Sequence, residues 1–278
     1  MTAGAAEPLP AAPAHQALVP PLRPGECQLW WASARDAHPR LRELLDEGER
    51  ARADRLRKPA ARALHLTAHA LARTVTAAQL GVSTDELTLT AVCKQCGGPH
   101  GKPQPPRPLR LSWSHSGERV VVALTLGTDI GVDVERIAPC EQETADRVLA
   151  PPERAALAAL PSAERPAGFV RYWTRKEALL KSTGDGLAVA PELLHVTAPA
   201  AAPRLLSWSG PDRPWLPLHL YDLDAGPGHL AALATVGAPV RPTRHDGSAL
   251  LAALHTPTDL LAGPVDPILP TAERPLAS

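Results

Sequence analysis

Aromatic residues and lysine are scarce in this 278-residue chain. Phe, Trp and Tyr together make up 3% of the residues, so the hydrophobic core must be built mainly from Leu, Val and Ala. Lysine occurs only at positions 58, 94, 102, 176 and 181, and the remaining Lys-or-Arg positions are all arginine. Since arginine cannot replace a compact ammonium charge, each lysine is a candidate functional residue.

The chain also has no excess of either charge and no long apolar run. Lys plus Arg and Asp plus Glu each total 29, which excludes a protein dominated by a basic nucleic-acid surface. No run of about 18 apolar residues is present, as a membrane-spanning helix would need, and residues 1–24 lack the pattern of a secretory signal. Cys is too sparse for a disulfide scaffold. We therefore expect a soluble, cytoplasmic protein with neither nucleic acid nor membrane as a partner.

The two ends differ in composition from the middle. Residues 1–24 are rich in Ala and Pro and are predicted to form a disordered leader, and residues 241–278 to form a loosely ordered tail. The order of helix and strand patterns between them predicts an α+β fold in two halves, 25–126 and 127–240. The tetrapeptide Leu-Ser-Trp-Ser occurs at 111–114 and 206–209, a weak indication of internal duplication.

Apolar periodicity predicts two long helices, over 60–80 and 168–183, which Gly81 and Gly184 end. Further helices are expected over 40–57 and 151–160. Predicted strands cover 27–32, 87–92, 109–114, 120–126, 130–135, 193–197, 205–208, 216–222 and 229–236. The residues 127–129 predict a short hairpin turn between the strands 120–126 and 130–135.

The strand 130–135 carries two carboxylates on one face. Strand alternation places Gly131, Asp133 and Glu135 together, and Mg²⁺ is commonly bound by one or two carboxylates plus substrate phosphates. Gly131 beside them leaves room for a ligand. The alternative is that these residues form the solvated outer face of a half-buried strand. When this strand is considered by itself, that alternative is favoured.

The predicted helix 168–183 carries a second chemical pattern. Trp173, Glu177 and Lys181 are spaced i, i+4 and i+8, so they form one stripe. A Glu four residues before a Lys is also the favourable order for a surface ion pair. The tryptophan at the start of the stripe argues that this face is covered.

Two loops offer further polar groups. Lys102 in Gly-Lys-Pro (101–103) and the hydroxyls and His115 of Ser-Trp-Ser-His-Ser-Gly (112–117) are suited to phosphate oxygens, or form hydrogen-bonded turns. Separately, Cys93, Cys96 and His100 offer zinc-type ligands. Structural zinc needs a fourth ligand, which Cys27 or Cys140 could supply, or no zinc is bound.

Taken together, these blocks resemble the signatures of the Sfp-type 4′-phosphopantetheinyl transferases. Gly-Val-Asp-Val-Glu-Arg (131–136) is followed by Trp-Thr-Arg-Lys-Glu-Ala-Leu-Leu-Lys (173–181), with 101–103 and 112–117 upstream in the family's order. The resemblance covers roughly residues 26–236 and implies a monomer of two similar α+β halves with a pseudo-twofold relation. Coenzyme A would lie between the halves.

The resemblance also implies a reaction. The family transfers 4′-phosphopantetheine from coenzyme A to a serine of an apo acyl or peptidyl carrier protein and releases adenosine 3′,5′-bisphosphate, with Mg²⁺ or Mn²⁺. By motif, the metal would be held by Asp133, Glu135 and Glu177. Contacts with coenzyme A would fall on Lys102, Ser114, His115, Asp133, Lys176 and Lys181.

One position departs from the family pattern. Its usual 3′-phosphate arginine corresponds to Leu64 here, so the residue that replaces it stays open. Arg62, two positions before, is our candidate for a coenzyme A contact, and His65 is adjacent. For catalysis, Glu177 is our candidate for the base that takes the serine proton, and Lys181 for a second positive charge at the phosphates. We expect an acidic carrier to dock near 141–172, on Arg147, Arg154, Arg165 and Arg171.

Two other functions remain open at this point: a non-catalytic module that binds coenzyme A or a carrier protein, and an adaptor held together by zinc.

Overall fold

The computed structural model describes residues 18–254 except 93, 95, 99–100 and 211–212. The main helices are α1 (Glu47–Arg55), α2 (Pro59–Leu80), α3 (Gln142–Val148), α4 (Pro151–Ala159), α5 (Arg165–Thr183) and α6 (Gly247–Ala253). The strands are β1 (Glu26–Ser33), β2 (Thr90–Ala91), β3 (Pro103–Gln104), β4 (Leu109–Ser116), β5 (Arg119–Leu126), β6 (Asp129–Arg136), β7 (Leu194–Val196), β8 (Leu205–Trp208), β9 (Leu218–Leu223), β10 (His229–Val236) and β11 (Arg241–Asp246). The predicted α+β class is confirmed, and no helix among the described residues is long and apolar enough to cross a membrane.

Two sheets, ordered β11-β1-β5-β4 and β6-β10-β9, repeat one topology. In each sheet, a first strand is followed by a long helix and then by two antiparallel strands, the second of which pairs with the first strand. The order is β1, α2, β4 and β5 in one half and β6, α5, β9 and β10 in the other. The expected pair of similar halves is visible in this element order, while the pseudo-twofold relation stays a prediction. The repeated Leu-Ser-Trp-Ser does not reflect this similarity of the halves, because its copies fall on β4 and β8, which are not equivalent strands.

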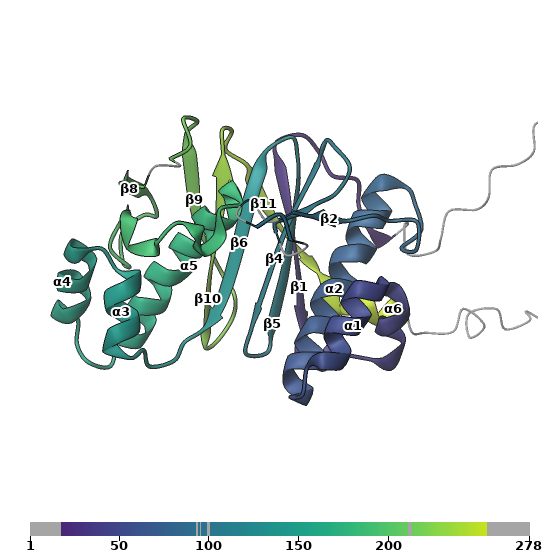
Figure 1. Ribbon diagram of the computed structural model, residues 1–278, viewed down its shortest axis with the longest axis horizontal. Coiled ribbons are helices and arrows are strands. Elements are labelled where there is room, and N and C mark those ends of the chain that lie inside the picture. The colour runs from purple at the N-terminus through teal and green to yellow at the C-terminus, as the bar shows by residue number, and fades with distance from the viewer. Residues whose placement is uncertain (1–17, 93, 95, 99–100, 211–212, 255–278) are drawn as a thin grey trace, which may run out of the picture.

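Figure 1 shows α2 outside one sheet and α5 outside the other, with both sheets between them. One apolar cluster joins α2 to the first sheet, a second joins α5 to the other, and a third fills the space between the sheets. The β-branched run Val120–Val122 contributes to two of these clusters, because alternate side chains of β5 point to opposite faces. The central strands are therefore covered on both faces.

The two long helices end where the sequence predicts. Gly81 and Gly184 adopt left-handed conformations with φ of 70° and 77°, which glycine reaches without strain. Gly131 on β6 serves packing rather than a ligand. A Cβ there would collide with the backbone of Ala178 and Ser182, so its absence lets α5 lie directly on β6.

Two predicted elements are shorter than expected. Residues 40–57 form a 3₁₀ turn (Pro39–Leu44) followed by α1, because Asp46 accepts the backbone N–H of Glu49 and starts a new helix. The strand predicted over 87–92 is reduced to β2. Buried Arg73 binds the carbonyl oxygens of Thr84 and Leu87, which holds the preceding segment against α2 in a non-strand conformation.

Both ends are ordered further outward than the sequence predicts. Val19 and Leu22 are buried in the α2 cluster, so the predicted leader cannot extend to residue 24. The chain after residue 240 returns to the N-terminal half, where β11 pairs in parallel with β1 and α6 buries Leu251. The predicted tail is therefore wrong over 241–254. The predictions for residues 1–17 and 255–278 lie outside the described residues.

The contact between β4 and β6 joins the two halves. The predicted hairpin between β5 and β6 is wrong, because β6 pairs with β10 instead. At this seam, serine hydroxyls of β4 take the place of a backbone ladder: Ser112 Oγ accepts the N–H of Val132 at 3.1 Å, and Ser116 Oγ accepts the N–H of Arg136 at 3.2 Å.

Candidate active site

Asp133 lies at the centre of the seam between β4, β6 and α5. Its carboxylate accepts hydrogen bonds on Oδ1 from Lys181 Nζ at 2.6 Å and from Ser114 Oγ at 2.8 Å. Asp133 is only 2% exposed, so the face of β6 that carries it is not a solvated one. Lys181 pairs with Asp133 rather than with Glu177, which removes the simple surface ion pair along α5.

Glu135 is held from both halves of the molecule. Ser116 Oγ donates to Oε2 at 2.5 Å, and the indole Nε1 of Trp173 lies 3.4 Å from Oε1. Burial raises the pKa of Glu135, and the neighbouring charge of Asp133 raises it further. The stripe predicted on α5 therefore faces the carboxylates of β6.

Glu177 completes the cluster. Burial is the main cause that raises its pKa to about 7, and the charge of Asp133 adds to the rise. Its Oε1 and the Oδ2 of Asp133 are buried without a hydrogen-bond partner in the described part of the chain. Buried acceptors without donors are costly, so these two oxygens point to a missing positive group.

The donor set suits Mg²⁺ or Mn²⁺, which prefer carboxylate oxygens. Within the described residues, no three potential metal ligands already stand in ligating geometry. The ammonium of Lys181 instead neutralises one oxygen of Asp133, while the partnerless oxygens of Asp133 and Glu177 keep acceptor capacity for a cation. The residues present therefore fit a divalent metal, with Glu135 beside them.

His115 extends from β4 on the side opposite to Ser114 and Ser116. Burial chiefly lowers its pKa, and the nearby charge of Lys181 lowers it further, with smaller effects from His69 and Arg52. Burial is likewise the main cause that lowers the pKa of His65 to about 4, and Arg52 adds to this shift as well. Arg52 of α1 is therefore a cation whose charge acts on both histidines, and sequence reasoning missed it.

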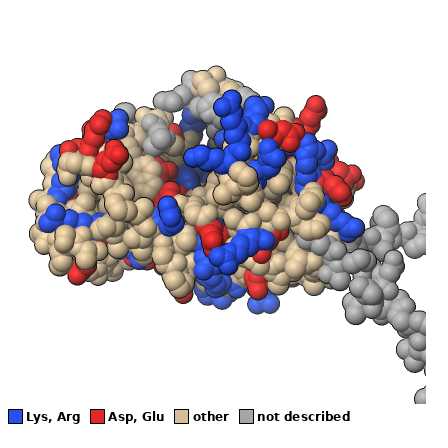
Figure 2. All heavy atoms as spheres, turned by 90° about the horizontal axis from the view of Figure 1, so that it is seen from below, with Lys and Arg blue, Asp and Glu red and all other residues tan. Residues whose placement is uncertain are grey.

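Two lysines tie the N-terminal half to the end of α5. Lys102 Nζ donates to the carbonyl of Ser182 at 2.8 Å, and burial lowers the pKa of Lys102 to about 8. Lys94 Nζ donates to the carbonyl of Thr183 and pairs with Asp185, each at 2.7 Å. Viewed from below the molecule, basic side chains gather beside a hollow near its centre (Figure 2).

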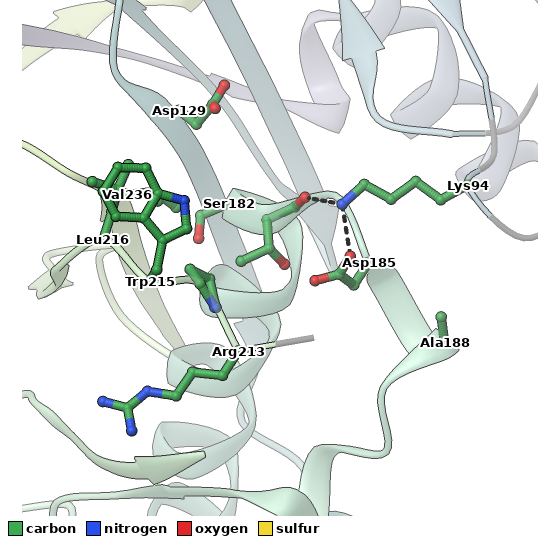
Figure 3. A pocket seen from close by; sticks show the side chains of 11 residues that line it. Lys94, Asp129, Ser182, Asp185, Ala188, Arg213, Trp215, Leu216 and Val236 are labelled. Carbon is green, nitrogen blue, oxygen red and sulfur yellow. Dashed lines mark hydrogen bonds and ion pairs between the residues drawn. The ribbon is translucent and has the colours of Figure 1, made fainter. Parts of the chain in front are cut away.

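A cavity of about 640 Å³ opens beside these lysine contacts. Figure 3 shows Lys94 reaching Asp185 on one side and Trp215 on the other side of this cavity. Trp215 is 91% exposed, which is unusual for so large an apolar ring. Neither Lys94 nor Trp215 stands in a block that the sequence analysis used for the site.

Three predicted coenzyme A contacts have partners within the protein itself. Lys176 is fully buried, pairs with Glu153 at 2.5 Å and donates to the carbonyl of Val148, so it faces away from β6. Arg62 is exposed and donates to the carbonyl of Leu56. The hydroxyl of Ser114 is buried against Asp133, where it holds a carboxylate rather than meeting a phosphate.

The zinc prediction is not tested, because Cys93 and His100 lie outside the described residues. Of its proposed fourth ligands, Cys27 is buried in the cluster between the sheets.

Comparison with known proteins identifies the family. Residues 129–234, which span β6 to β10, match the model of the 4′-phosphopantetheinyl transferase superfamily. The 4′-phosphopantetheinyl transferase HetI of Nostoc is 31% identical over 197 residues, covering 66% of this chain and 81% of HetI. The chain belongs to the 4′-phosphopantetheinyl transferase superfamily. The resemblance and the enzyme class predicted from the sequence are thereby confirmed.

Other matches cover shorter stretches. A putative 4′-phosphopantetheinyl transferase of Synechocystis, slr0495, is 33% identical over 168 residues, which are 58% of this chain and 66% of the relative. Among solved structures, the holo-[acyl-carrier-protein] synthase of Thermotoga maritima matches with a TM-score of 0.34 and 19% identity, over 41% of this chain and 64% of that one.

Proposed function

We propose that this phosphopantetheinyl transferase moves the 4′-phosphopantetheine group of coenzyme A onto a serine of an apo acyl or peptidyl carrier protein and releases adenosine 3′,5′-bisphosphate. The observation that carries the proposal is the cluster of Asp133, Glu177 and Lys181, in which one buried oxygen of each carboxylate lacks a donor. A binding module without chemistry would have no need for such a cluster.

The reaction places charge where this cluster has matching groups. The serine oxygen forms a bond to the phosphorus that carries pantetheine, the bond from that phosphorus to the bridging oxygen breaks, and the nucleotide phosphate leaves with the electron pair. Charge on the phosphate oxygens is stabilised by fixed cations. Lys181 is such a cation, because Asp133 fixes its ammonium at 2.6 Å.

The serine proton needs an acceptor. In the metal-free protein the pKa of Glu177 is about 7, and a bound cation would lower it from there. A base is most effective when its pKa lies near or below the operating pH, where it is free to accept a proton. We assign this proton to a carboxylate oxygen of Glu177. Asp133, Glu135 and Glu177 would hold Mg²⁺, or Mn²⁺, which when bound supplies charge neutralisation at the phosphates.

The nucleotide end of coenzyme A would lie against the N-terminal half. We propose that His115, Lys102 and Arg52 contact it, with Arg52 in the role first expected of Arg62. Burial lowers the pKa of His115 most, and the charges of Lys181 and Arg52 lower it further. Lys102 lies at the seam between the halves. We further propose a monomer in the cytoplasm.

The carrier surface also changes from the sequence prediction. Arg154 and Arg165 bind backbone carbonyl groups and Arg171 pairs with Asp222. The side chain of Arg147 is 73% exposed, more than those of Arg154 and Arg171. A largely apolar cavity of about 370 Å³ adjoins the site and is lined by Glu135, Cys140, Phe169 and Trp173, among others. We propose that the carrier docks over this cavity, which leads its serine to Glu177.

The test is the mass of an apo carrier protein after incubation with the enzyme, coenzyme A and Mg²⁺. We expect the carrier to gain one phosphopantetheine group and adenosine 3′,5′-bisphosphate to appear. Coenzyme A binding without any change in carrier mass, across acyl and peptidyl carriers, would favour the binding module instead.

A further inference from the structure

Ser116 is the last residue of β4, and its hydroxyl has no part in the transfer described above. Two hydrogen bonds define its environment. Its Oγ accepts the backbone N–H of Arg136 at 3.2 Å and donates to Glu135 Oε2 at 2.5 Å. Because the backbone N–H occupies an acceptor position on Oγ, the hydroxyl proton is left to point at the carboxylate.

This bond crosses from one half of the molecule to the other. Ser116 belongs to the first sheet, whereas Glu135 belongs to β6 of the second. A hydrogen bond from a hydroxyl to a carboxylate is shorter and stronger than one between neutral groups. The other oxygen of Glu135 faces the Trp173 indole, so both oxygens have a neighbouring donor.

The other two carboxylates of the cluster are held differently. Asp133 has one oxygen bound by Ser114 and Lys181 and one without a partner, and Glu177 has a buried oxygen without a partner. Both Asp133 and Glu135 accept a hydrogen bond from a serine of the N-terminal half. On Asp133 the same oxygen also binds Lys181, whereas on Glu135 Oε2 is bound by Ser116 and not by Lys181. The bond from Ser116 therefore restricts how the Glu135 carboxylate is turned.

We propose that Ser116 is a positioning residue for the metal, which fixes the Glu135 carboxylate and so makes cation binding depend on the contact between the two halves. The inference rests on the proposed function, because it takes Glu135 as a metal ligand. Residues that hold a metal ligand in place typically change metal affinity 10–100-fold when they are removed. The proposed transfer uses Ser116 neither at the phosphates nor for the serine proton.

Ser112 provides a matched control on the same strand. Its Oγ accepts the N–H of Val132 at 3.1 Å, so it makes the same kind of seam bond, but no carboxylate bond from Ser112 is found among the described residues. Ser112→Ala removes a seam contact without touching the cluster. Ser116→Thr keeps a hydroxyl and is the conservative variant.

The experiment is a titration of the wild type and the three variants with Mn²⁺ alone, in which electron paramagnetic resonance measures free Mn²⁺. We expect Ser116→Ala to weaken Mn²⁺ binding about 10–100-fold, Ser116→Thr to restore most of it, and Ser112→Ala to stay within about twofold of the wild type. Melting temperatures confirm that each variant folds. In the transfer assay, Ser116→Ala should need more Mg²⁺ for half-maximal rate, with the coenzyme A KM unchanged.

Wild-type affinity in Ser116→Ala, or an equal loss in Ser112→Ala, would overturn the positioning role and leave the proposed function intact. A wild type that modifies the carrier yet binds no Mn²⁺ would overturn the role as well. A wild type that binds Mn²⁺ but never modifies a carrier would instead contradict the proposed function, while the comparison of variants still decides the role of Ser116.

Discussion

Lys181 and Asp133 form an ion pair between α5 and β6, with Nζ of the lysine 2.6 Å from Oδ1 of the aspartate. The ammonium also donates to the carbonyl of Val132 at 3.2 Å, so its position is fixed by two bonds to β6. The pair therefore presents a fixed positive charge beside a partnerless carboxylate oxygen. This arrangement suits an anionic substrate group that lies beside a bound cation.

Replacing Lys181 should affect the reaction, whereas replacing Lys176 should affect stability. Lys181→Ala removes the fixed charge, so we expect kcat to fall about 10²-fold or more, as when other preorganised donors are removed. Lys181→Arg keeps the charge but not its compact shape and should recover only part of the rate.

The control lies on the same helix. Lys176→Met removes a buried partner of Glu153, so it should lower the melting temperature because it leaves a buried carboxylate unpaired. The coenzyme A KM of any folded Lys176→Met protein should match the wild type. A raised coenzyme A KM at full stability would restore Lys176 to the site.

Glu177→Gln separates the roles of base and ligand. The substitution keeps the shape of the side chain but removes its basicity, so turnover should drop about 10²–10⁴-fold without recovery at high Mg²⁺. Asp133→Ala should also lose turnover, with partial recovery at high Mg²⁺. Steady-state rates across a Mg²⁺ series check both, and near-normal turnover of Glu177→Gln would rule it out as the base.

The raised pKa of Glu177 also predicts how stability changes with pH. Its pKa rises from 4.5 in the unfolded chain to about 7 in the folded protein, so the folded state binds the proton more tightly. Stability from this group is fully present below about pH 4.5 and is lost as the pH rises through about 7. The lowered pKa values of His65 and His115 act in the opposite direction over this range, so the part due to Glu177 is measured in metal-free protein as the change in melting temperature between pH 5 and pH 8 relative to Glu177→Gln.

Glu177→Gln cannot titrate, so this variant should show a smaller fall in melting temperature over the same pH range. An equal fall in the variant would assign the effect to other groups, among which Glu135 also has a raised pKa.

Alanine variants of Arg52 and Arg62 test which arginine contacts the nucleotide end of coenzyme A. Arg52→Ala should raise the coenzyme A KM about tenfold, as loss of one charge-assisted contact would, and should leave the carrier KM unchanged. Arg62→Ala removes a bond to the carbonyl of Leu56 and should change neither KM. The reverse result would return the contact to Arg62.

The strand β11 and helix α6 should be needed for stability. Ending the chain at Val240 removes the parallel partner of β1 and exposes the surface that Leu250 and Leu251 cover. Each fully buried leucine contributes about 1.5–3 kcal/mol, so we expect a loss of several kcal/mol and a clearly lower melting temperature. An unchanged melting temperature would show that this segment adds little to the fold.

Local signals explain what the sequence predicted well. Gly81 and Gly184 mark helix ends because they reach left-handed conformations that other residues avoid. The spacing of Trp173, Glu177 and Lys181 placed the right face of α5 on β6, since helical neighbours at i+4 share a face. The same geometry turns Lys176 away, because adjacent helical residues point about 100° apart.

Long-range pairing explains what the sequence did not predict. β11 pairs with β1 across almost the whole described chain, and nothing local in residues 241–246 indicates such a distant partner. The serine contacts between β4 and β6 were equally hidden, because a hydroxyl near a strand end suits a phosphate as well as a carboxylate. Only the fold decides between these partners.

The central claim is group transfer at the cluster of Asp133, Glu177 and Lys181. Its most direct test follows intact carrier mass and adenosine 3′,5′-bisphosphate together, with wild type and Glu177→Gln at saturating coenzyme A and Mg²⁺. The account predicts that holo-carrier and adenosine 3′,5′-bisphosphate form in equal amounts with the wild type and far more slowly with the variant. Release of the nucleotide without modified carrier, or equal rates for both proteins, would contradict it.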